Sequence, residues 1–197
     1  HVQLDFSQLT GQYDMMLAGD LNGDGIDDLV LRGSGRWAYC LAQQPSGNVP
    51  AFSPCQFGGT LPNIGKRAAS LLANFDGNGK SQLLYFDEAR QAHVCGYNGT
   101  VTCRTVNTTV PASVELRDLI PIALSKQGQS DFYMVRDPVL YPDSPQLNVT
   151  ICRMFQSGLQ CSIVDAGDRF SAGLGAGDAN GDGLTDFFYG VTNGSKL

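Results

Sequence analysis

Short apolar runs recur along the chain and alternate with segments rich in Gly, Asp and Asn. No long window shows the 3.6-residue periodicity of an amphipathic helix, whereas runs such as Gln82–Phe86, His93–Tyr97 and Thr100–Val106 have the length and composition of β-strands. Asn98-Gly99, between two of these runs, predicts a tight hairpin because both residues tolerate positive φ. The pattern predicts an all-β chain of short antiparallel strands.

A nine-residue acidic motif recurs between these runs. Asp20–Asp28 and Asp178–Asp186 match closely, Asn74–Gln82 is a weaker copy, and a nearly erased copy ends at Asp131. The last positions of the copies are 54, 49 and 55 residues apart. An apolar run precedes each copy and further strand-like runs follow, so each unit of roughly 50 residues predicts a four-stranded antiparallel sheet, the size of a β-propeller blade. The predicted repeats, within one propeller region spanning residues 1–197, cover residues 14–67, 68–117, 118–172 and 173–197.

The six cysteines follow the same repeat. One pair falls in each of the first three units, on either side of the expected turn between the outer strands. Local disulfides in an oxidising compartment are the favoured interpretation, with buried free thiols as the alternative. Zinc is disfavoured because the chain has no Cys-x-x-Cys motif and only two His. The expected pairs are Cys40/Cys55, Cys95/Cys103 and Cys152/Cys161.

Four Asn-x-Ser/Thr sequons weakly favour an extracellular protein: Asn98, Asn107, Asn148 and Asn193.

Composition and charge argue against several classes of function. The net charge is −6 without a Lys/Arg cluster, which disfavours nucleic acid and anionic membranes as partners. No apolar stretch approaches the ~20 residues of a membrane span, so membrane insertion is not expected. The chain has no Gly-x-Ser-x-Gly elbow or phosphate-binding glycine loop, and His93 lies within a strand-like run. We therefore expect a non-catalytic protein.

The two well-kept acidic motifs predict calcium sites. Each places oxygen-bearing side chains at positions 1, 3, 5 and 9, a glycine at position 6 and a backbone carbonyl at position 7, which suits the six to eight hard oxygen ligands of Ca²⁺. The alternative is an Asp/Asn/Gly turn without an ion. The weaker copy keeps Asp76 and Asn78 but has Lys80 inside the loop and Gln82 at its end, so we expect it to be empty, with Lys80 in place of the ion. The candidate ligands are Asp20, Asn22, Asp24, Ile26 (carbonyl) and Asp28 in one loop, and Asp178, Asn180, Asp182, Leu184 (carbonyl) and Asp186 in the other.

The segments Gly19-Asp-Leu-Asn-Gly-Asp-Gly-Ile-Asp-Asp-Leu-Val and Gly177-Asp-Ala-Asn-Gly-Asp-Gly-Leu-Thr-Asp-Phe-Phe closely resemble FG-GAP repeats, the blades of the integrin α-subunit propeller and of related secreted bacterial and fungal propellers. The resemblance implies that each calcium loop joins two strands of a blade, that the ion is structural, and that partners bind elsewhere. Because such propellers close with six or seven blades, we expect part of a larger propeller; the alternative is a small ring closed by a strand within residues 1–10.

The expected function is that of a secreted, periplasmic or cell-surface propeller, stabilised by calcium, that binds a protein or glycan on a cell surface or the remainder of a larger propeller. One alternative is a structural segment of a toxin-complex or Rhs-like shell, against which the paired cysteines argue. Another is a sugar-binding lectin. Its candidate stacking residues are Trp37, Tyr39, Phe155 and Tyr189, although packing inside a blade is the favoured role for each.

Overall fold

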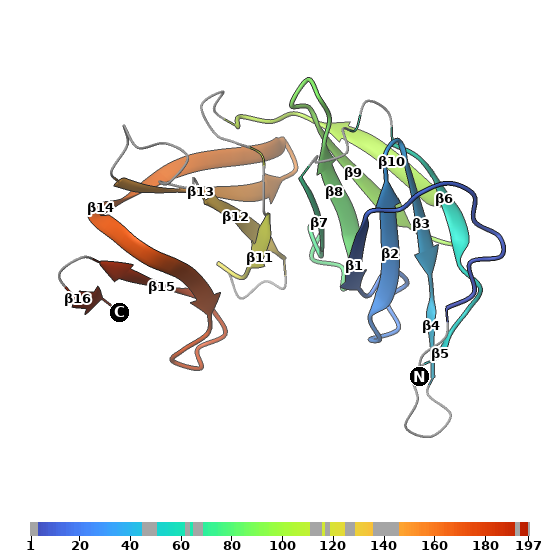
Figure 1. Ribbon diagram of the computed structural model, residues 1–197, viewed down its shortest axis with the longest axis horizontal. Helices are drawn as coiled ribbons and strands as arrows, with labels where there is room; N and C mark the ends of the chain where they lie inside the picture. The colour runs from blue at the N-terminus through green and yellow to red at the C-terminus, as the bar shows by residue number, and fades with distance from the viewer. Residues whose placement is uncertain are drawn as a thin grey trace. The chain divides into compact units, whose positions relative to one another are not determined.

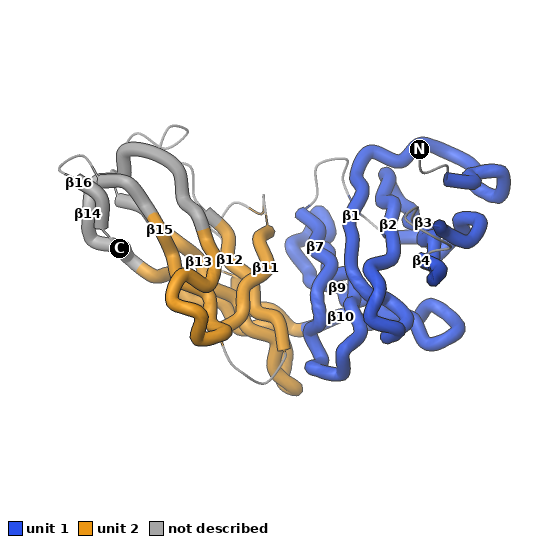
Figure 2. Tube along the Cα trace, turned by 90° about the horizontal axis from the view of Figure 1, so that it is seen from below, with its two compact units in different colours: residues 1–106 blue, residues 107–197 orange. Residues whose placement is uncertain are grey.

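The regular structure of the described residues is entirely β. The computed structural model contains no helix there, and its strands pair antiparallel, apart from one isolated parallel bridge between Thr108 and Leu159. This confirms the predicted all-β, antiparallel class. The chain divides into two compact units, His1–Val106 and Asn107–Leu197 (Figures 1 and 2). The structure describes residues 4–44, 51–61, 64, 69–110, 116, 119–124, 129–135, 146–191 and 194–196.

The first sheet of unit 1 has four strands in the order β1-β2-β3-β6. The first acidic loop connects β1 to β2, and Gly19 pairs with Asp28 where the loop begins and ends. A two-residue turn containing Gly35, with φ of 75°, joins β2 to β3. The small ribbon β4–β5 lies between β3 and β6 in the chain. The strands are β1 (Met15–Gly19), β2 (Asp28–Gly33), β3 (Arg36–Cys40), β4 (Ala42–Gln43), β5 (Ala51–Phe52) and β6 (Gln56–Thr60).

The second sheet of unit 1 is a four-stranded meander in chain order. Its strands are β7 (Ser70–Ala73), β8 (Gln82–Phe86), β9 (Ala92–Tyr97) and β10 (Val101–Val106). The weaker acidic copy lies between β7 and β8. The hairpin predicted at Asn98-Gly99 joins β9 to β10, with φ of 74° at Gly99. The strand expectations in this repeat are therefore confirmed to within a residue or two.

The two sheets of unit 1 pack face to face around one core. Val30, Trp37 and Tyr39 of the first sheet and Leu83 and Tyr85 of the second belong to the same buried cluster. Neighbouring residues on these strands point to the opposite face, because side chains alternate along a strand. Since both faces of β2 and β3 are covered, their middle residues, 29–31 and 37–40, are apolar without alternating with polar residues.

The outer face of the first sheet is covered by the N-terminal segment. Leu31 and Ala38 form a second buried cluster on this face, and Leu9 and Tyr13 pack against it. A closing strand within residues 1–10 was the alternative prediction; residues 4–10 form no strand, and residues 1–3 lie outside the described part. The segment is held by backbone, for example by the Cys55 N–H bonded to the Asp5 carbonyl at 2.9 Å.

Unit 2 contains one sheet of six strands in chain order. A single strand, β14, pairs with β13 through its first part and with β15 through its second part. The sequence has two separate strand-like runs here, Leu159–Val164 and Leu174–Ala176, and the structure joins them in one strand. The strands are β11 (Ile120–Ile122), β12 (Asp131–Val135), β13 (Gln146–Phe155), β14 (Gly158–Gly177), β15 (Asp186–Val191) and β16 (Gly194–Lys196). In the described part of the chain, no helix is long and apolar enough to cross a membrane.

All three expected disulfides are present. Cys40–Cys55, Cys95–Cys103 and Cys152–Cys161 link the third strand of a sheet to the next strand or to the residue that precedes it, and no cysteine is free. Cys95 and Cys103 face each other directly in the β9–β10 register, as Cys152 and Cys161 do between β13 and β14. The cysteine pairs therefore follow the sequence repeat because they occupy equivalent positions on neighbouring strands.

Candidate metal centre

The first acidic loop, residues 20–28, is organised by hydrogen bonds from its own backbone. The Asp20 carboxylate accepts N–H groups from Gly23 (2.6 Å) and Asp24 (3.2 Å) at Oδ1 and from Gly25 (2.8 Å) at Oδ2. Gly23 and Gly25 have φ of 86° and 83°, a conformation that glycine adopts without steric cost. The residue at position 1 therefore fixes the turn through contacts within five residues of itself.

Two further side chains repeat this arrangement inside the loop. Asn22 Oδ1 accepts the Asp24 N–H at 2.8 Å, and Asp24 Oδ1 accepts the Ile26 N–H at 2.9 Å. Asn22 Nδ2 also donates to Asp24 Oδ2 at 3.0 Å. Carboxylate and amide oxygens carry two lone pairs each, so the oxygens of Asn22 and Asp24 keep acceptor capacity beyond these bonds.

Asp28, at position 9, is fully buried at the start of β2. Its Oδ2 accepts the Leu21 N–H at 2.9 Å and its Oδ1 accepts the Ala42 N–H at 2.7 Å. Burial raises the pKa of Asp28, the hydrogen bonds from Ala42 and Leu21 partly oppose the rise, and the charge of Asp24 adds to it. Negative charge is therefore concentrated in this loop at a cost that a bound cation would offset.

The second acidic loop, residues 178–186, repeats most of the hydrogen bonds of the first loop. Six hydrogen bonds are shared, and no distance differs by more than 0.1 Å between the loops. Asp186 is half-buried here, whereas its counterpart Asp28 is fully buried. The bonds are Gly181 N–H and Asp182 N–H to Asp178 Oδ1 (2.7 and 3.1 Å), Gly183 N–H to Asp178 Oδ2 (2.8 Å), Asp182 N–H to Asn180 Oδ1 (2.9 Å), Leu184 N–H to Asp182 Oδ1 (2.8 Å) and Ala179 N–H to Asp186 Oδ2 (3.0 Å).

The donor set of these loops fits calcium by its chemistry. At its expected ligand positions each loop carries three carboxylates, one amide oxygen and the carbonyl at position 7 within nine residues, and hard oxygens of these kinds are what Ca²⁺ takes. Within the described ranges, no group of three or more His, Cys, Asp or Glu side chains is placed to hold a metal ion. The other oxygens that the loops offer are those of Asn22 and the Ile26 carbonyl, and of Asn180 and the Leu184 carbonyl.

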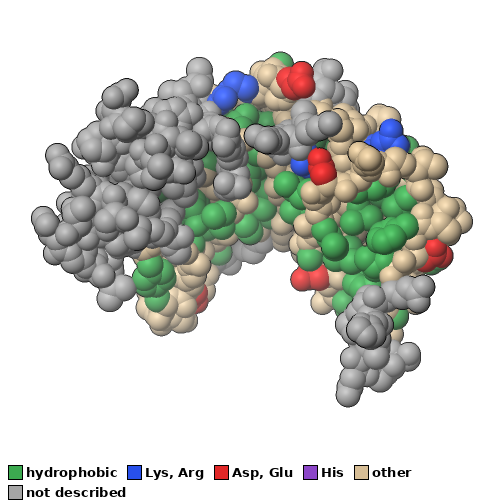
Figure 3. Space-filling model, viewed as in Figure 1, with side chains coloured by type: hydrophobic (Ala, Val, Ile, Leu, Met, Phe, Trp, Pro, Cys, Tyr) green, Lys and Arg blue, Asp and Glu red, His purple; other side chains and the backbone are tan. Residues whose placement is uncertain are grey.

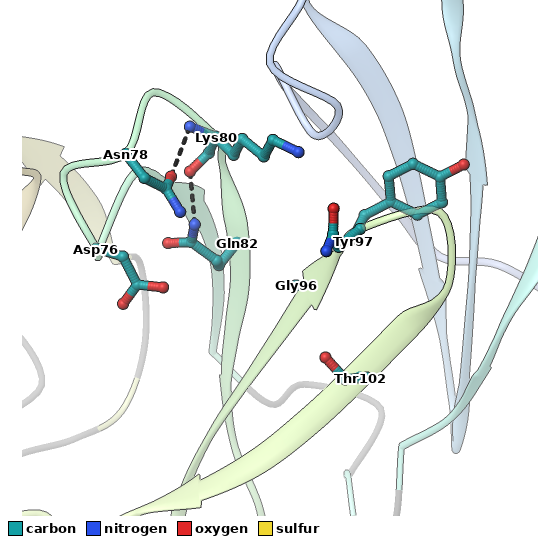
Figure 4. A pocket seen from close by; sticks show the side chains of 8 residues that line it. Asp76, Asn78, Lys80, Gln82, Gly96, Tyr97 and Thr102 are labelled. Atoms are coloured by element: carbon teal, nitrogen blue, oxygen red, sulfur yellow. Dashed lines mark hydrogen bonds between the residues drawn. The ribbon is translucent and has the colours of Figure 1, made fainter.

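The weaker copy, residues 74–82, is closed by the amide of Gln82. Gln82 Oε1 accepts the Phe75 N–H at 2.7 Å, and Gln82 Nε2 donates to the Lys80 carbonyl at 2.6 Å (Figure 4). That carbonyl is at position 7, the one that Ile26 and Leu184 offer in the acidic loops. We had expected Lys80 to replace the ion, but the group bonded inside this loop is the neutral amide of Gln82, and the Lys80 side chain extends away from Asn78 and Gln82 (Figure 4).

The erased copy, residues 123–131, has a carboxylate at position 9 and at no other position. Asp131 is buried, its Oδ2 accepts a hydrogen bond from Arg153 Nε at 3.1 Å, and it also accepts the backbone N–H of Leu124. Burial raises the pKa of Asp131, and the bond and charge of Arg153 oppose the rise without cancelling it. A basic side chain from β13 here partners the carboxylate.

Two contacts shared by the copies were missed by the sequence analysis. In all four, the side chain at position 9 accepts the N–H of position 2, which explains why an acceptor persists where the other ligands are lost. The N–H at position 8 bonds to the carbonyl that directly follows an earlier strand: the Ser81 N–H to the Asp20 carbonyl at 2.6 Å, and the Thr185 N–H to the Ala123 carbonyl at 2.8 Å. Asp20 follows β1 of the preceding sheet, whereas Ala123 follows β11, the first strand of the six-stranded sheet to which β15 also belongs.

A polar pocket of about 310 Å³ lies beside the weaker copy (Figure 4). Asp76, Asn78 and Lys80 come from the loop, while Tyr97 and Thr102 come from the β9–β10 hairpin. Asp76 also contacts Arg104 Nη2 at 3.5 Å. Gln82, Gly96 and Asn98 complete the lining.

His93 is a sheet residue, as its place in the sequence indicated. It lies opposite Tyr85 and Thr105 in the register of β8, β9 and β10. Its Nε2 is 3.0 Å from Asp87 Oδ2, its Nδ1 is 3.3 Å from Thr105 Oγ1, and its ring stacks on Tyr85 with centroids 4.7 Å apart. These contacts fix the imidazole within a cross-strand row.

The candidate sugar-stacking aromatics divide by exposure. Trp37 and Tyr39 are buried in the core of unit 1, in agreement with the favoured packing role, whereas Phe155 is 44% exposed. The side chain of Tyr189 lies outside the described residues. Of the sequons, Asn98 and Asn107 are exposed, and the side chains of Asn148 and Asn193 lie outside the described residues.

No protein-family model matches the chain, and no curated protein matches it.

Proposed function

We propose that this chain is a calcium-stabilised β-propeller region of the FG-GAP type that acts as a non-catalytic binding module for a protein or cell-surface partner outside the cell. The observation that carries the calcium part is the shared hydrogen-bond scheme of the loops at residues 20–28 and 178–186. Both loops join neighbouring antiparallel strands, as calcium loops of that family do.

Three features support propeller blades. Unit 1 has two four-stranded antiparallel sheets in which the acidic copy joins the first two strands. Those sheets bury a common core, the way neighbouring blades pack. The position-8 bond from Ser81 to Asp20 ties the loop of the second sheet to the first sheet, and its counterpart from Thr185 to Ala123 ties the second acidic loop to the end of β11. Further blades of a larger propeller, or closure of a small ring, would complete the architecture.

The disulfides support an extracellular or periplasmic location. Three disulfides and no free cysteine suit an oxidising compartment. A toxin shell assembled in a reducing cytoplasm would not maintain them, so this alternative is disfavoured.

Exposed apolar side chains support the binding role. Phe6, Met16 and Phe57 of unit 1 are each about half exposed, at 47%, 57% and 55%. Figure 3 shows hydrophobic side chains gathered on one face of this unit. Apolar patches on a soluble domain are typical of surfaces that bind partners.

Calcium titration calorimetry on the chelated protein tests the calcium part. We expect about two sites per chain and a higher melting temperature with calcium, since a ligand at a hundred times its Kd stabilises by about 2.7 kcal/mol. Asp24→Ala and Asp182→Ala are each expected to remove one site. Asp27→Ala, which removes an exposed carboxylate at position 8 of the first loop, is the matched control and should retain both. Absence of heat and of stabilisation in the parent chain would overturn the proposal.

Binding of the labelled protein to cultured cells tests the partner. We expect calcium-dependent binding that is lost after mild trypsin treatment of the cells and is reduced by Phe57→Ser. Binding that persists with a chelator, or that is equal for protease-treated cells, would contradict a protein partner whose recognition needs the calcium-loaded fold.

The polar pocket favours sugar binding as the second candidate function. Its carboxylate, amide and hydroxyl groups, with Tyr97 beside them, are of the kinds that bind a polyhydroxylated ring. A glycan array separates the candidates: a lectin would show saccharide binding that Thr102→Trp abolishes by filling the pocket. Thr100→Trp, in the exposed hairpin turn and outside the lining, is the control.

A further inference from the structure

We propose that Lys80 is an intramolecular counter-cation for the first acidic loop, which stabilises that loop without calcium and lowers its calcium affinity. This inference deepens the proposed calcium function and rests on it for the affinity part. Lys80 belongs to the neighbouring, degenerate copy, so the cation and the carboxylates come from different sheets of unit 1.

The contact between the two loops is direct. The aliphatic stem of Lys80 lies against Gly23: a Cβ placed on Gly23 would be 3.0 Å from Lys80 Cε and 3.1 Å from Lys80 Cγ. The ammonium nitrogen is one covalent bond beyond Cε. Gly23 itself donates to Asp20 Oδ1 at 2.6 Å. The positive charge therefore sits alongside the acidic loop, and any side chain at Gly23 would crowd the lysine.

The backbone next to Lys80 fixes this approach. The Ser81 N–H bonds to the Asp20 carbonyl at 2.6 Å, and Ser81 Oγ lies 2.8 Å from the Cβ that Gly19 lacks. The Lys80 N–H is bonded to Asn78 Oδ1 at 2.9 Å, and its carbonyl is bonded to Gln82 Nε2 at 2.6 Å. The main chain of Lys80 is thus held on both sides, and its side chain crosses to the other loop.

The charges of the degenerate copy do not compete for Lys80. The carboxylate of Asp76 contacts Arg104, and position 9 is the neutral Gln82. The first acidic loop contains four carboxylates within nine residues: Asp20, Asp24, Asp27 and Asp28. A fixed cation beside this cluster relieves repulsion when no ion is bound and repels a divalent ion that enters. At surface separations and 0.1 M salt, we expect an effect on the order of threefold on calcium affinity.

The test uses chains in which a single loop can bind. In the Asp182→Ala background, which leaves the first loop, Lys80→Met is expected to raise calcium affinity about threefold at low salt, and Lys80→Arg is expected to leave it unchanged. The gain should shrink in 0.5 M KCl because exposed charges are screened. In the Asp24→Ala background, which leaves the second loop, Lys80→Met should have no effect. Lys80→Gln is a second neutral variant if the Met variant folds poorly.

Thermal melting in chelator tests, without any bound ion, whether Lys80 stabilises the first acidic loop. Lys80→Met is expected to melt below Lys80→Arg, and the difference should narrow as salt is added. Equal calcium affinity of Lys80→Met and Lys80→Arg in the Asp182→Ala background, where calcium does bind, would overturn the affinity effect. Absence of calcium binding in every variant would be the failure of the proposed function instead. Equal melting temperatures of Lys80→Met and Lys80→Arg in chelator would overturn the proposed role of Lys80 as a counter-cation.

Discussion

The side-chain amide of Gln82 donates a hydrogen bond to the Lys80 carbonyl at 2.6 Å, at the position where the acidic loops offer a carbonyl as a ligand. The same amide accepts the Phe75 N–H through its oxygen. One neutral side chain therefore closes a nine-residue loop whose relatives in the same chain carry carboxylates. The degenerate copy therefore closes its loop with a neutral side chain at position 9.

Replacing Gln82 should destabilise the protein to the same extent with and without calcium. Gln82 is buried, and Gln82→Ala removes both of its loop-closing hydrogen bonds. We expect a loss of about 2 kcal/mol in the free energy of unfolding, because buried polar groups of the backbone lose their partners. Urea unfolding in calcium and in chelator measures it. Gln91→Ala, at an exposed side chain, is the control, and a loss seen with calcium alone would show that Gln82 acts through an ion.

Gly58 should tolerate no larger residue, because β6 passes close to a buried ring. A Cβ on Gly58 would lie 2.7 Å from Trp37 Cδ2 and Cε2, and Trp37 is fully buried in the core of unit 1. We expect Gly58→Ala to cost about 1–3 kcal/mol of unfolding free energy through overpacking. Gly96→Ala is the matched strand substitution: its Cβ would meet Gln82 Cγ at 3.6 Å, an ordinary contact. Equal stability of the two variants would contradict the close approach.

Asp87 should contribute stability that is lost in acid. Burial, the largest contribution, raises the pKa of Asp87, but its hydrogen bonds with His93 and from the Gln91 N–H together outweigh it and hold the pKa below the usual 3.8. A carboxyl whose pKa is lowered on folding stabilises the protein above its unfolded pKa and loses that effect as pH falls through its folded pKa. The stability difference between the parent and Asp87→Asn should therefore shrink as the pH falls below 3.8.

The contribution of Asp131 to stability should change with pH in the opposite direction, so Asp131 serves as the comparison for Asp87. Burial raises the pKa of Asp131 above 3.8 despite Arg153, so its ionisation is less favourable in the folded chain than in the unfolded chain. The stability that the protonated carboxyl provides at low pH is lost as pH rises through the folded pKa. Asp131→Asn should thus gain stability relative to the parent as pH rises from below 3.8. A parallel pH dependence of the two variants in chemical denaturation would refute these assignments.

The three disulfides should differ in their resistance to reduction. Both Cys40 and Cys55 are fully buried, whereas Cys103 is exposed and Cys161 is half-buried. A reductant must reach a sulfur, so Cys40–Cys55 is expected to be reduced last in the native protein. Timed treatment with a phosphine, alkylation and peptide mapping give the order. Reduction of Cys40–Cys55 at the same rate as the others would mean that unit 1 opens readily.

The acidic loops and the hairpin were predictable because their conformations are set locally. In residues 20–28, side-chain oxygens bond to N–H groups two to five residues away and glycines supply positive φ, so the turn follows from spacing alone. The same holds for Asn98-Gly99. The disulfide pairs were predictable because one pair of cysteines falls in each of the first three repeats, although their separations of 15, 8 and 9 residues differ.

The role of each side chain beyond its own loop depended on contacts between distant elements. Sequence alone placed a lysine in the degenerate copy, but packing of the two sheets decided that Lys80 crosses to Gly23 while Gln82 closes the loop. Packing likewise buried Trp37 and covered the outer face of the first sheet with Leu9. Local hydrogen bonds determined the all-β repeat and its acidic turns. Burial of apolar surface between the sheets determined which residues of distant elements contact one another.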